Sequence, residues 1–120
     1  CRCDTTETVL DKCRRADFGF VGEPYRSEVT VINGRQYNRF CFNVLFIFKG
    51  PRLLGDRCVI SPVSSSICGI GFELGRTYIV NGNIHFNEKE VNLCGWNQPW
   101  SELSFALMRL LSTIPGICDS

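Results

Sequence analysis

The chain has 120 residues, a formal net charge of +1 at pH 7 and no apolar run longer than the five residues from Val44 to Phe48. This length fits one domain of roughly 100–150 residues, so we expect a single domain over residues 1–120. A net charge near zero and the lack of an apolar segment of ~20 residues argue against a nucleic-acid partner and against membrane insertion.

The N-terminal part of the chain predicts a short helix and then a strand. Thr5 or Thr6 is suited to cap the helix, and Glu7 in its first turn would interact favourably with the helix dipole. From Phe18 onward apolar residues recur at every second position, which indicates a strand that ends before Pro24.

The middle of the chain predicts a hairpin and a long central strand. Residues 29–32 are β-branched, and the dipeptide 33–34 is Asn-Gly, which is typical of a tight hairpin turn. Residues 40–49 alternate in a way that predicts a long strand with both faces partly buried. One face carries Phe40, Phe42, Val44, Phe46 and Phe48, and the other carries Cys41, Asn43, Leu45 and Ile47.

The second half predicts further short strands and a closing helix. We expect strands at residues 58–60 and 77–80, a turn at Asn81-Gly82 and a last strand at 91–96. A buried apolar stripe then predicts a helix that begins after Ser101. The fold class is therefore all-β with flanking helices, most simply a β-barrel with helices packed on its outside.

The cysteines indicate an oxidising compartment. There are eight: Cys1, Cys3, Cys13, Cys41, Cys58, Cys68, Cys94 and Cys118. The only close pair is Cys1-x-Cys3 and the only histidine is His85, so the pattern favours disulfides over zinc ligation. Eight cysteines allow 105 pairings, and the spacing does not choose between them. Since the chain opens on Cys1 without a methionine, we expect a processed, secreted, extracellular protein.

No catalytic constellation stands out in the sequence. A G-x-S-x-G motif is absent, and His85 lies alone in an alternating segment, where a structural role is expected. We therefore expect a binding protein that is not an enzyme and has no cofactor of its own.

A set of short motifs runs in a fixed order along the whole chain. They are Cys1-Arg2-Cys3, Cys13, Phe20-Val21-Gly22, Phe48-Lys49-Gly50, Ser66-Ile67-Cys68-Gly69, Cys94, Pro99-Trp100-Ser101-Glu102-Leu103-Ser104 and Cys118. In this order they resemble the N-terminal inhibitory domain of the tissue inhibitors of metalloproteinases, within the wider netrin-module family. The second domain of vertebrate members has no counterpart here, which points to a single-domain form such as a nematode one.

The resemblance implies a five-stranded OB-like barrel and three disulfides. The implied pairs are Cys1–Cys68, Cys3–Cys94 and Cys13–Cys118. Cys41 and Cys58 remain, and we expect them to form a fourth bridge, because they fall on neighbouring predicted strands.

The resemblance also implies a mechanism and a partner, a secreted or cell-surface zinc metalloproteinase. The α-amine and carbonyl oxygen of Cys1 would chelate the catalytic zinc, which belongs to the target, and displace its bound water. Only the neutral amine can ligate, so binding should release protons near neutral pH. The implied protease-binding residues are Cys1, Arg2, Cys3, Asp4, Ser65, Ser66, Ile67 and Cys68.

Arg2 departs from the small, uncharged residue that is usual in the family. An unpartnered guanidinium in an apolar pocket costs several kcal/mol, and each 1.4 kcal/mol is about tenfold in affinity. Arg2 would therefore weaken binding to ordinary targets about a hundredfold or more, or redirect the protein to a wide, wet or acidic pocket. Asp4 would pair with Arg2 or cap the first helix.

Plainer interpretations remain open at each of these positions. The C-x-C terminus can be a structural staple, Arg2 a solvated charge, and residues 64–66 a polar loop. The alternative function is a related binding module without protease inhibition, for example a modulator of host immunity or inflammation that binds a cell-surface receptor or a matrix component. A third reading is a matrix or glycosaminoglycan adhesive module using Lys12, Arg14 and Arg15, although a solvated helix face explains these three better and the net charge argues against the module.

Overall fold

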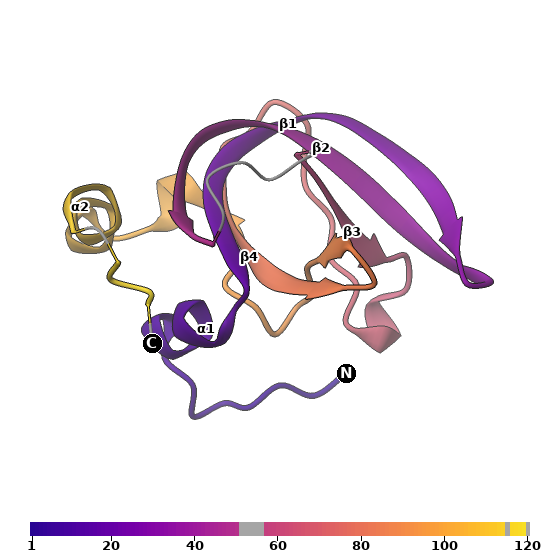
Figure 1. The fold of residues 1–120 in the computed structure, drawn as a ribbon, viewed down its shortest axis with the longest axis horizontal. Coiled ribbons are helices and arrows are strands. Elements are labelled where there is room, and N and C mark those ends of the chain that lie inside the picture. The colour runs from indigo at the N-terminus through magenta and orange to yellow at the C-terminus, as the bar shows by residue number, and fades with distance from the viewer. Residues whose placement is uncertain (51–56, 115, 120) are drawn as a thin grey trace.

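The structure is a computed structural model that describes residues 1–50, 57–114 and 116–119. Its strands are β1 (Phe18–Ile32), β2 (Arg35–Lys49), β3 (Cys58–Pro62), β4 (Tyr78–His85), β5 (Glu88–Glu90) and β6 (Gln98–Pro99). Its helices are α1 (Val9–Arg15) and α2 (Phe105–Thr113), with single 3₁₀ turns at η1 (Ser65–Ile67) and η2 (Trp100–Glu102) (Figure 1). No helix among the described residues is long and apolar enough to cross a membrane.

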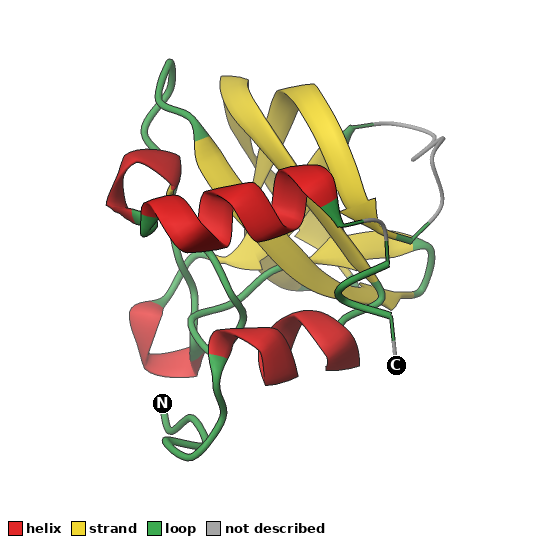
Figure 2. Cartoon of the chain, turned by 90° about the vertical axis from the view of Figure 1, so that its left-hand side faces the viewer, coloured by secondary structure: helices red, strands yellow, loops and turns green. Residues whose placement is uncertain are grey.

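The first five strands close into a ring because β1 has partners on both sides. The order is β1-β2-β3-β5-β4, and residues 18–22 of β1 also pair with β4. The pairs are antiparallel except β3 with β5, which run parallel at Ile60 and Glu90. The fold is therefore all-β with flanking helices and is consistent with the predicted OB-like architecture. Figure 2 looks onto the two helices, which lie in front of the strands.

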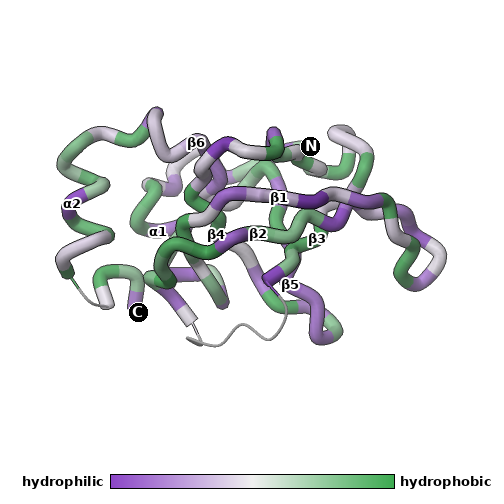
Figure 3. Tube along the Cα trace, turned by 90° about the horizontal axis from the view of Figure 1, so that it is seen from above, coloured by the Kyte–Doolittle hydropathy of each residue, from purple (hydrophilic) through white to green (hydrophobic). Residues whose placement is uncertain are grey.

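The β1–β2 hairpin extends well beyond the ring. The molecule measures 40 × 31 × 25 Å along its principal axes. Figure 3 shows α1 and α2 at one end and the tip of the hairpin at the other. The turn at Asn33-Gly34 has positive φ at both residues, 51° and 77°, as the sequence predicted for a two-residue hairpin.

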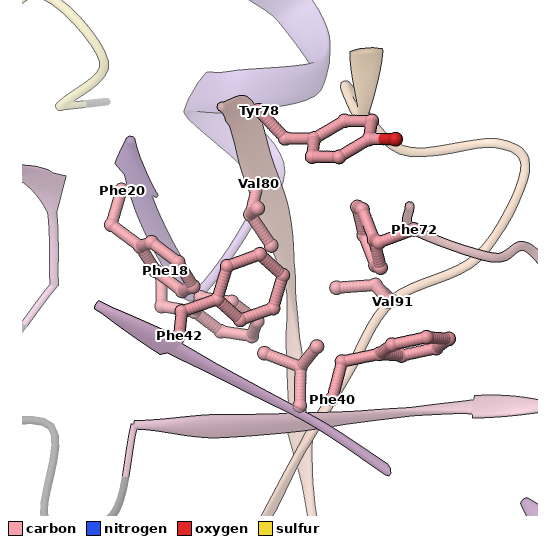
Figure 4. Packing of buried hydrophobic residues seen from close by; sticks show 9 residues of the cluster. Phe18, Phe20, Phe40, Phe42, Phe72, Tyr78, Val80 and Val91 are labelled. Atoms are coloured by element: carbon pink, nitrogen blue, oxygen red, sulfur yellow. The ribbon is translucent and has the colours of Figure 1, made fainter. Parts of the chain in front are cut away.

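Aromatic rings fill the inside of the ring of strands (Figure 4). Phe72 is central, because its ring meets Phe40, Phe42 and Tyr78 edge-on at centroid distances of 4.9–5.2 Å. Edge-to-face pairs at this distance add stabilisation beyond the burial of their area. The buried residues of this inner core are Phe18, Phe20, Phe40, Phe42, Val59, Phe72, Tyr78, Val80 and Val91.

A second core joins the ring to both helices. Val21 and Ile79 point away from the inner core and meet side chains of α1, α2 and the η2 region. The buried residues of this outer core are Cys13, Val21, Ile79, Trp96, Leu103, Leu111 and Cys118. Because Cys13 lies on α1, this core fixes the helix that follows the N-terminal segment.

β2 contributes to both cores, as expected for a strand with two partly buried faces, but its alternating residues from Phe40 to Phe48 do not all share one face as predicted. Val21 pairs with Phe46 and Gly22 with Val44, so Leu45 is an extra residue in the ladder and is 64% exposed. An extra residue of this kind reverses the direction of the side chains that follow it. Val44 therefore packs against the inner core, whereas Phe46 packs against the outer core.

Several of the strand predictions are wrong. β1 continues through Pro24 to Ile32, because the pairing with β4 ends at Gly22 and the Phe42 residue opposite Pro24 donates its N–H to Arg57, so no ladder bond requires the N–H that proline lacks. β4 continues through Asn81-Gly82 and turns only after His85. The segment 91–96 contains no strand and leads instead to the short strand β6.

Both helices begin later than predicted. The Thr8 hydroxyl accepts a hydrogen bond from the Asp11 N–H at 3.1 Å, and the Asp11 carboxylate accepts one from the Thr8 N–H at 3.0 Å. This reciprocal capping box makes Thr8 the cap of α1, in place of an earlier threonine. α2 is capped by Ser104, since Ser101 lies in η2.

Four disulfides hold the chain together: Cys1–Cys68, Cys3–Cys94, Cys13–Cys118 and Cys41–Cys58. The first three are the pairs that the family resemblance implies. The fourth joins β2 to β3 at residues that face each other in the ladder.

Candidate functional site

The first residues of the chain are held at two closely spaced points. The Cα atoms of Cys1 and Cys68 lie 5.3 Å apart, and those of Cys3 and Cys94 lie 5.2 Å apart. Arg15 reinforces the second point, because its guanidinium donates to the Glu7 carboxylate at 2.6 Å and to the Cys94 carbonyl at 2.9 Å. The N-terminus is therefore fixed to two loops of the ring rather than extending freely from α1.

The loop that holds Cys68 has its own internal hydrogen bonds. Ser64 caps η1, and the hydroxyls of Ser64 and Ser66 lie 2.7 Å apart. Cys68 adopts a left-handed conformation with φ 67°, which directs the chain back on itself. The Gly69 N–H donates to the Ser64 carbonyl at 3.0 Å, and a Cβ at Gly69 would lie 2.0 Å from the Pro62 carbonyl oxygen. A glycine is thus needed for the close return of this loop.

A third segment, absent from the predicted site, lies beside the other two. The Leu93 N–H donates to the Cys68 carbonyl at 2.9 Å, and the Leu93 side chain is 55% exposed. The Asn92 side chain accepts from the Cys94 N–H at 2.8 Å and so shapes the turn. The signal that could have revealed Leu93 is its position next to Cys94, the implied partner of Cys3.

The structure brings the predicted site residues together on one surface. We call residues 1–4 and 65–68 together with Leu93 the N-terminal ridge. Two of its members, Cys3 and Cys68, are half-buried. The exposed members are Cys1, Arg2, Asp4, Ser65, Ser66, Ile67 and Leu93. Ile67 is 48% exposed, so the ridge combines the chain's amino group with two uncovered aliphatic side chains.

The two charged side chains of the ridge do not contact each other. The Asp4 carboxylate accepts hydrogen bonds from the Thr6 hydroxyl at 2.6 Å and the Thr6 N–H at 2.9 Å, and these bonds lower its pKa. Both expectations for Asp4 are therefore wrong, since it neither pairs with Arg2 nor caps α1. Within the described part of the chain the Arg2 guanidinium has no ion pair.

Four sulfur atoms gather under the ridge. Those of Cys1, Cys3, Cys68 and Cys94 all lie within 4.8 Å of one another. Metal ligation by cysteine requires thiolates, and these sulfurs are oxidised in disulfides. The four sulfurs under the ridge are therefore not available as metal ligands.

The other singled-out residues lie outside the ridge. In the basic cluster, Arg15 forms an ion pair with Glu7, and Lys12 is half-buried. Arg14 is exposed and has no ion pair among the described residues. His85 is exposed and lines a cavity of about 270 Å³ between the two hairpin tips, beside Phe86.

The fold is an OB-like module of the netrin type. It has a closed ring of five strands with helices on the outside. Two disulfides hold its N-terminus, and a third joins Cys13 of α1 to Cys118. The family model for the tissue inhibitor of metalloproteinase matches residues 1–115. The chain belongs to the tissue inhibitor of metalloproteinase family.

Two relatives from Margaritifera margaritifera match nearly the whole chain. "Uncharacterized shell protein 1" is 45% identical over 119 residues, covering 98% of this chain and 81% of the relative. "NTR domain-containing protein" is 38% identical over 120 residues, with the same two coverages. The similarity therefore extends across the cores and the ridge alike.

Proposed function

We propose that this protein is a secreted inhibitor of zinc metalloproteinases that acts through the N-terminal ridge. The observation that carries the proposal is the exposed first residue, Cys1, held by its disulfide to Cys68 beside the uncovered side chains of Ile67 and Leu93. Family membership supports a protease as the partner and an extracellular location. Under this proposal the protein is a ligand of an enzyme and not itself an enzyme.

The inhibitory step needs no side-chain chemistry from this chain. The neutral α-amine and the carbonyl oxygen of Cys1 would occupy two positions on the target's zinc and replace the water that attacks substrate. The Cys1–Cys68 bridge fixes both atoms before binding, so little conformational entropy is lost on association. Ile67 and Leu93 would lose water-exposed apolar area in the complex.

Arg2 would set which proteases are inhibited. It follows the chelating residue directly, and the Arg2 guanidinium has no ion pair among the described residues. A target pocket with a carboxylate beyond the zinc would provide the missing partner, whereas an apolar pocket would not. We therefore propose a target whose pocket is acidic or open to water.

An alanine placed ahead of Cys1 tests the chelation directly. The extension moves the α-amine off Cys1, and we expect at least a hundredfold rise in the inhibition constant against any protease that the protein beginning at Cys1 inhibits. The matched control carries the same alanine after the last residue and should inhibit normally. Equal inhibition by the N-terminally extended protein would contradict the proposal.

A second candidate is a binding module that has lost inhibition and recognises a component of an extracellular matrix. Two observations favour it: the exposed charge of Arg2, which has no ion pair in the described part of the chain, and a relative whose name describes a shell protein. Arg2→Thr separates the two candidates, with Arg2→Lys as the control that keeps the charge. If Arg2→Thr inhibits a protease that the parent and Arg2→Lys do not inhibit, the rest of the ridge is able to inhibit and the charge of Arg2 prevents it. If none of the three proteins inhibits any protease, the matrix candidate stands.

A further inference from the structure

The cavity of about 270 Å³ between the β1–β2 and β4–β5 hairpins shares none of its described lining residues with the N-terminal ridge. Both hairpins point to the side of the molecule away from α2 (Figure 1). OB folds commonly bind oligosaccharides or oligonucleotides here, on the second and third strands between the two loops. A shared fold does not define a ligand, so the lining residues have to decide what this cavity binds.

Strand alternation explains how the base of the cavity is built. Phe40 and Val59 belong to the inner core, so Tyr37 on β2 and Ile60 on β3 point to the outside of the ring. Both line the cavity. Ile60 is only 3% exposed, whereas Tyr37 is half-buried. The cavity therefore has an apolar floor beside an aromatic side chain.

Charged side chains surround this floor, and their charges cancel. Arg39 donates two hydrogen bonds of 3.1 and 3.2 Å to the carboxylate of Glu88, which lines the cavity. Arg35 is exposed and Glu90 is half-buried, and neither has an ion pair among the described residues. Arg39 thus balances Glu88, and Arg35 balances Glu90. A half-buried carboxylate without an ion pair gains free energy when a ligand donates a hydrogen bond to it.

Phe86 completes the lining at a cost to the fold. It lies at the tip of the β4–β5 hairpin, is 88% exposed and has φ 51°. A bulky side chain at positive φ is strained, and such strain is concentrated where proteins hold ligands. Since neither burial nor backbone conformation favours phenylalanine here, we infer that its ring contacts a ligand.

We propose that this cavity binds one sugar unit of a neutral polysaccharide. A pyranose has apolar C–H groups on its faces, which suit contact with Phe86 and Tyr37. Its hydroxyls lie around the rim of the ring, where Glu90 can accept and Arg35 can donate hydrogen bonds. A phosphate or sulfate would meet two carboxylates, and a cation would meet Arg35. The proposal does not depend on protease inhibition, because it uses no residue of the ridge.

NMR titration of isotopically labelled protein with cellotetraose and with N-acetylchitotriose tests the site. Both probes are neutral, and their sugar units have flat apolar faces. Contact with one sugar unit gives weak binding, so we expect a dissociation constant of about millimolar order. Backbone resonances should shift around residues 33–37 and 85–90 and stay unchanged at residues 1–4 and 65–68. No shift with either probe at about 10 mM, or shifts confined to the ridge, overturns the proposal.

Phe86→Asn removes the ring without straining the hairpin, since asparagine tolerates a left-handed backbone. We expect the dissociation constant for both sugars to rise at least tenfold. The matched control is Phe105→Asn, which removes another exposed ring, on α2 and outside the cavity, and should bind like the parent. A Phe86→Asn protein that binds as tightly as the parent, or a control that loses binding equally, overturns the proposal.

A matched set of charged sugars tests the choice of a neutral ligand. Deacetylated chitotriose keeps the rings of N-acetylchitotriose but carries amines, and a heparin tetrasaccharide carries sulfates. Because the charges of the lining cancel, we expect neither to bind the cavity more tightly than the neutral sugars. Tighter binding of the amine form would show a cation site, and tighter binding of heparin an anion site. Either result overturns the proposal.

Discussion

Phe86 illustrates a residue whose type does not suit its place in the fold. It stands at the tip of the β4–β5 hairpin with φ 51° and is 88% exposed. The β1–β2 hairpin has the same two-residue turn length, and Asn33 there has the same φ. Asparagine tolerates a left-handed backbone, whereas a bulky side chain at positive φ is strained. Phe86 thus gains nothing from burial and adds backbone strain.

Phe86→Asn should therefore stabilise the protein. We expect the free energy of unfolding to rise by about 1 kcal/mol and the melting temperature by about 4 °C. Thermal unfolding followed by circular dichroism measures both. Phe86→Ala removes the ring but keeps a β-carbon at positive φ, so it should leave stability nearly unchanged. A gain with alanine as large as with asparagine would contradict the explanation from backbone strain.

At the scale of elements, the loop between β3 and β4 depends on one glycine to support the ridge. A Cβ at Gly69 would lie 2.0 Å from the Pro62 carbonyl oxygen, and backbone atoms on both sides of the contact leave little room to adjust. Gly71 is two residues further on, and a Cβ there meets nothing within 4 Å. The two glycines therefore form a matched pair of positions in one loop.

Gly69→Ala should displace the segment 64–68 and, through the Cys1–Cys68 bridge, the N-terminus. We expect a loss of about 1–3 kcal/mol of stability, as for other overpacked positions, and weaker binding of any partner of the ridge. Gly71→Ala should leave both properties close to the parent. Urea denaturation and a binding assay on both variants provide the comparison. Equal behaviour of the two variants would show that the close approach at Gly69 is not required.

The elements also show where sequence reasoning succeeds and where it fails. Asn-Gly occurs at residues 33–34 and again at 81–82, and the same turn was predicted for both. At the second position Asn81 is buried and donates to the Phe18 carbonyl at 3.0 Å. A Cβ at Gly82 would lie 2.1 Å from the Glu90 carbonyl, so the strand needs glycine for close packing. Such tertiary reasons are not visible in a local pattern.

The same limit applies to the candidate site. Its cysteines, Arg2 and the segment 65–67 followed from ordered motifs, because a family resemblance carries long-range information. Leu93 did not, since its place on the ridge depends on a hydrogen bond to the Cys68 carbonyl. The change of face in β2 was missed for a related reason: the extra residue at Leu45 breaks the alternation from which the face was predicted.

At the scale of the whole molecule, the four disulfides divide into two kinds. Three of them join the first 13 residues to distant parts of the chain, over separations of 67, 91 and 105 residues. Cys41–Cys58 has a separation of 17 and joins two strands that already pair. The loop-entropy model assigns the longer bridges the larger effect on the unfolded state.

Replacing Cys41 and Cys58 together by alanine should lower the free energy of unfolding by about 3 kcal/mol. The ridge should remain intact, because its own bridges are untouched. Replacing Cys13 and Cys118 together should cost somewhat more on the same model, because the loop that this bridge closes is still longer than that of Cys41–Cys58 when Cys3–Cys94 is intact. Denaturation in urea with intact remaining disulfides measures the two losses. A larger loss from the Cys41–Cys58 pair would show that packing within the sheet outweighs loop entropy.

The long separations of the three N-terminal bridges also determine the order in which the molecule can be completed. A chain is synthesised from its N-terminus, so Cys1, Cys3 and Cys13 emerge first. Their partners follow 67, 91 and 105 residues later, the last of them almost at the end of the chain. The early thiols meet one another before they meet those partners, and any bonds formed between them must be exchanged later. The N-terminal segment of the ridge is thus synthesised before all of its disulfide partners and is among the last parts of the molecule to be set in place.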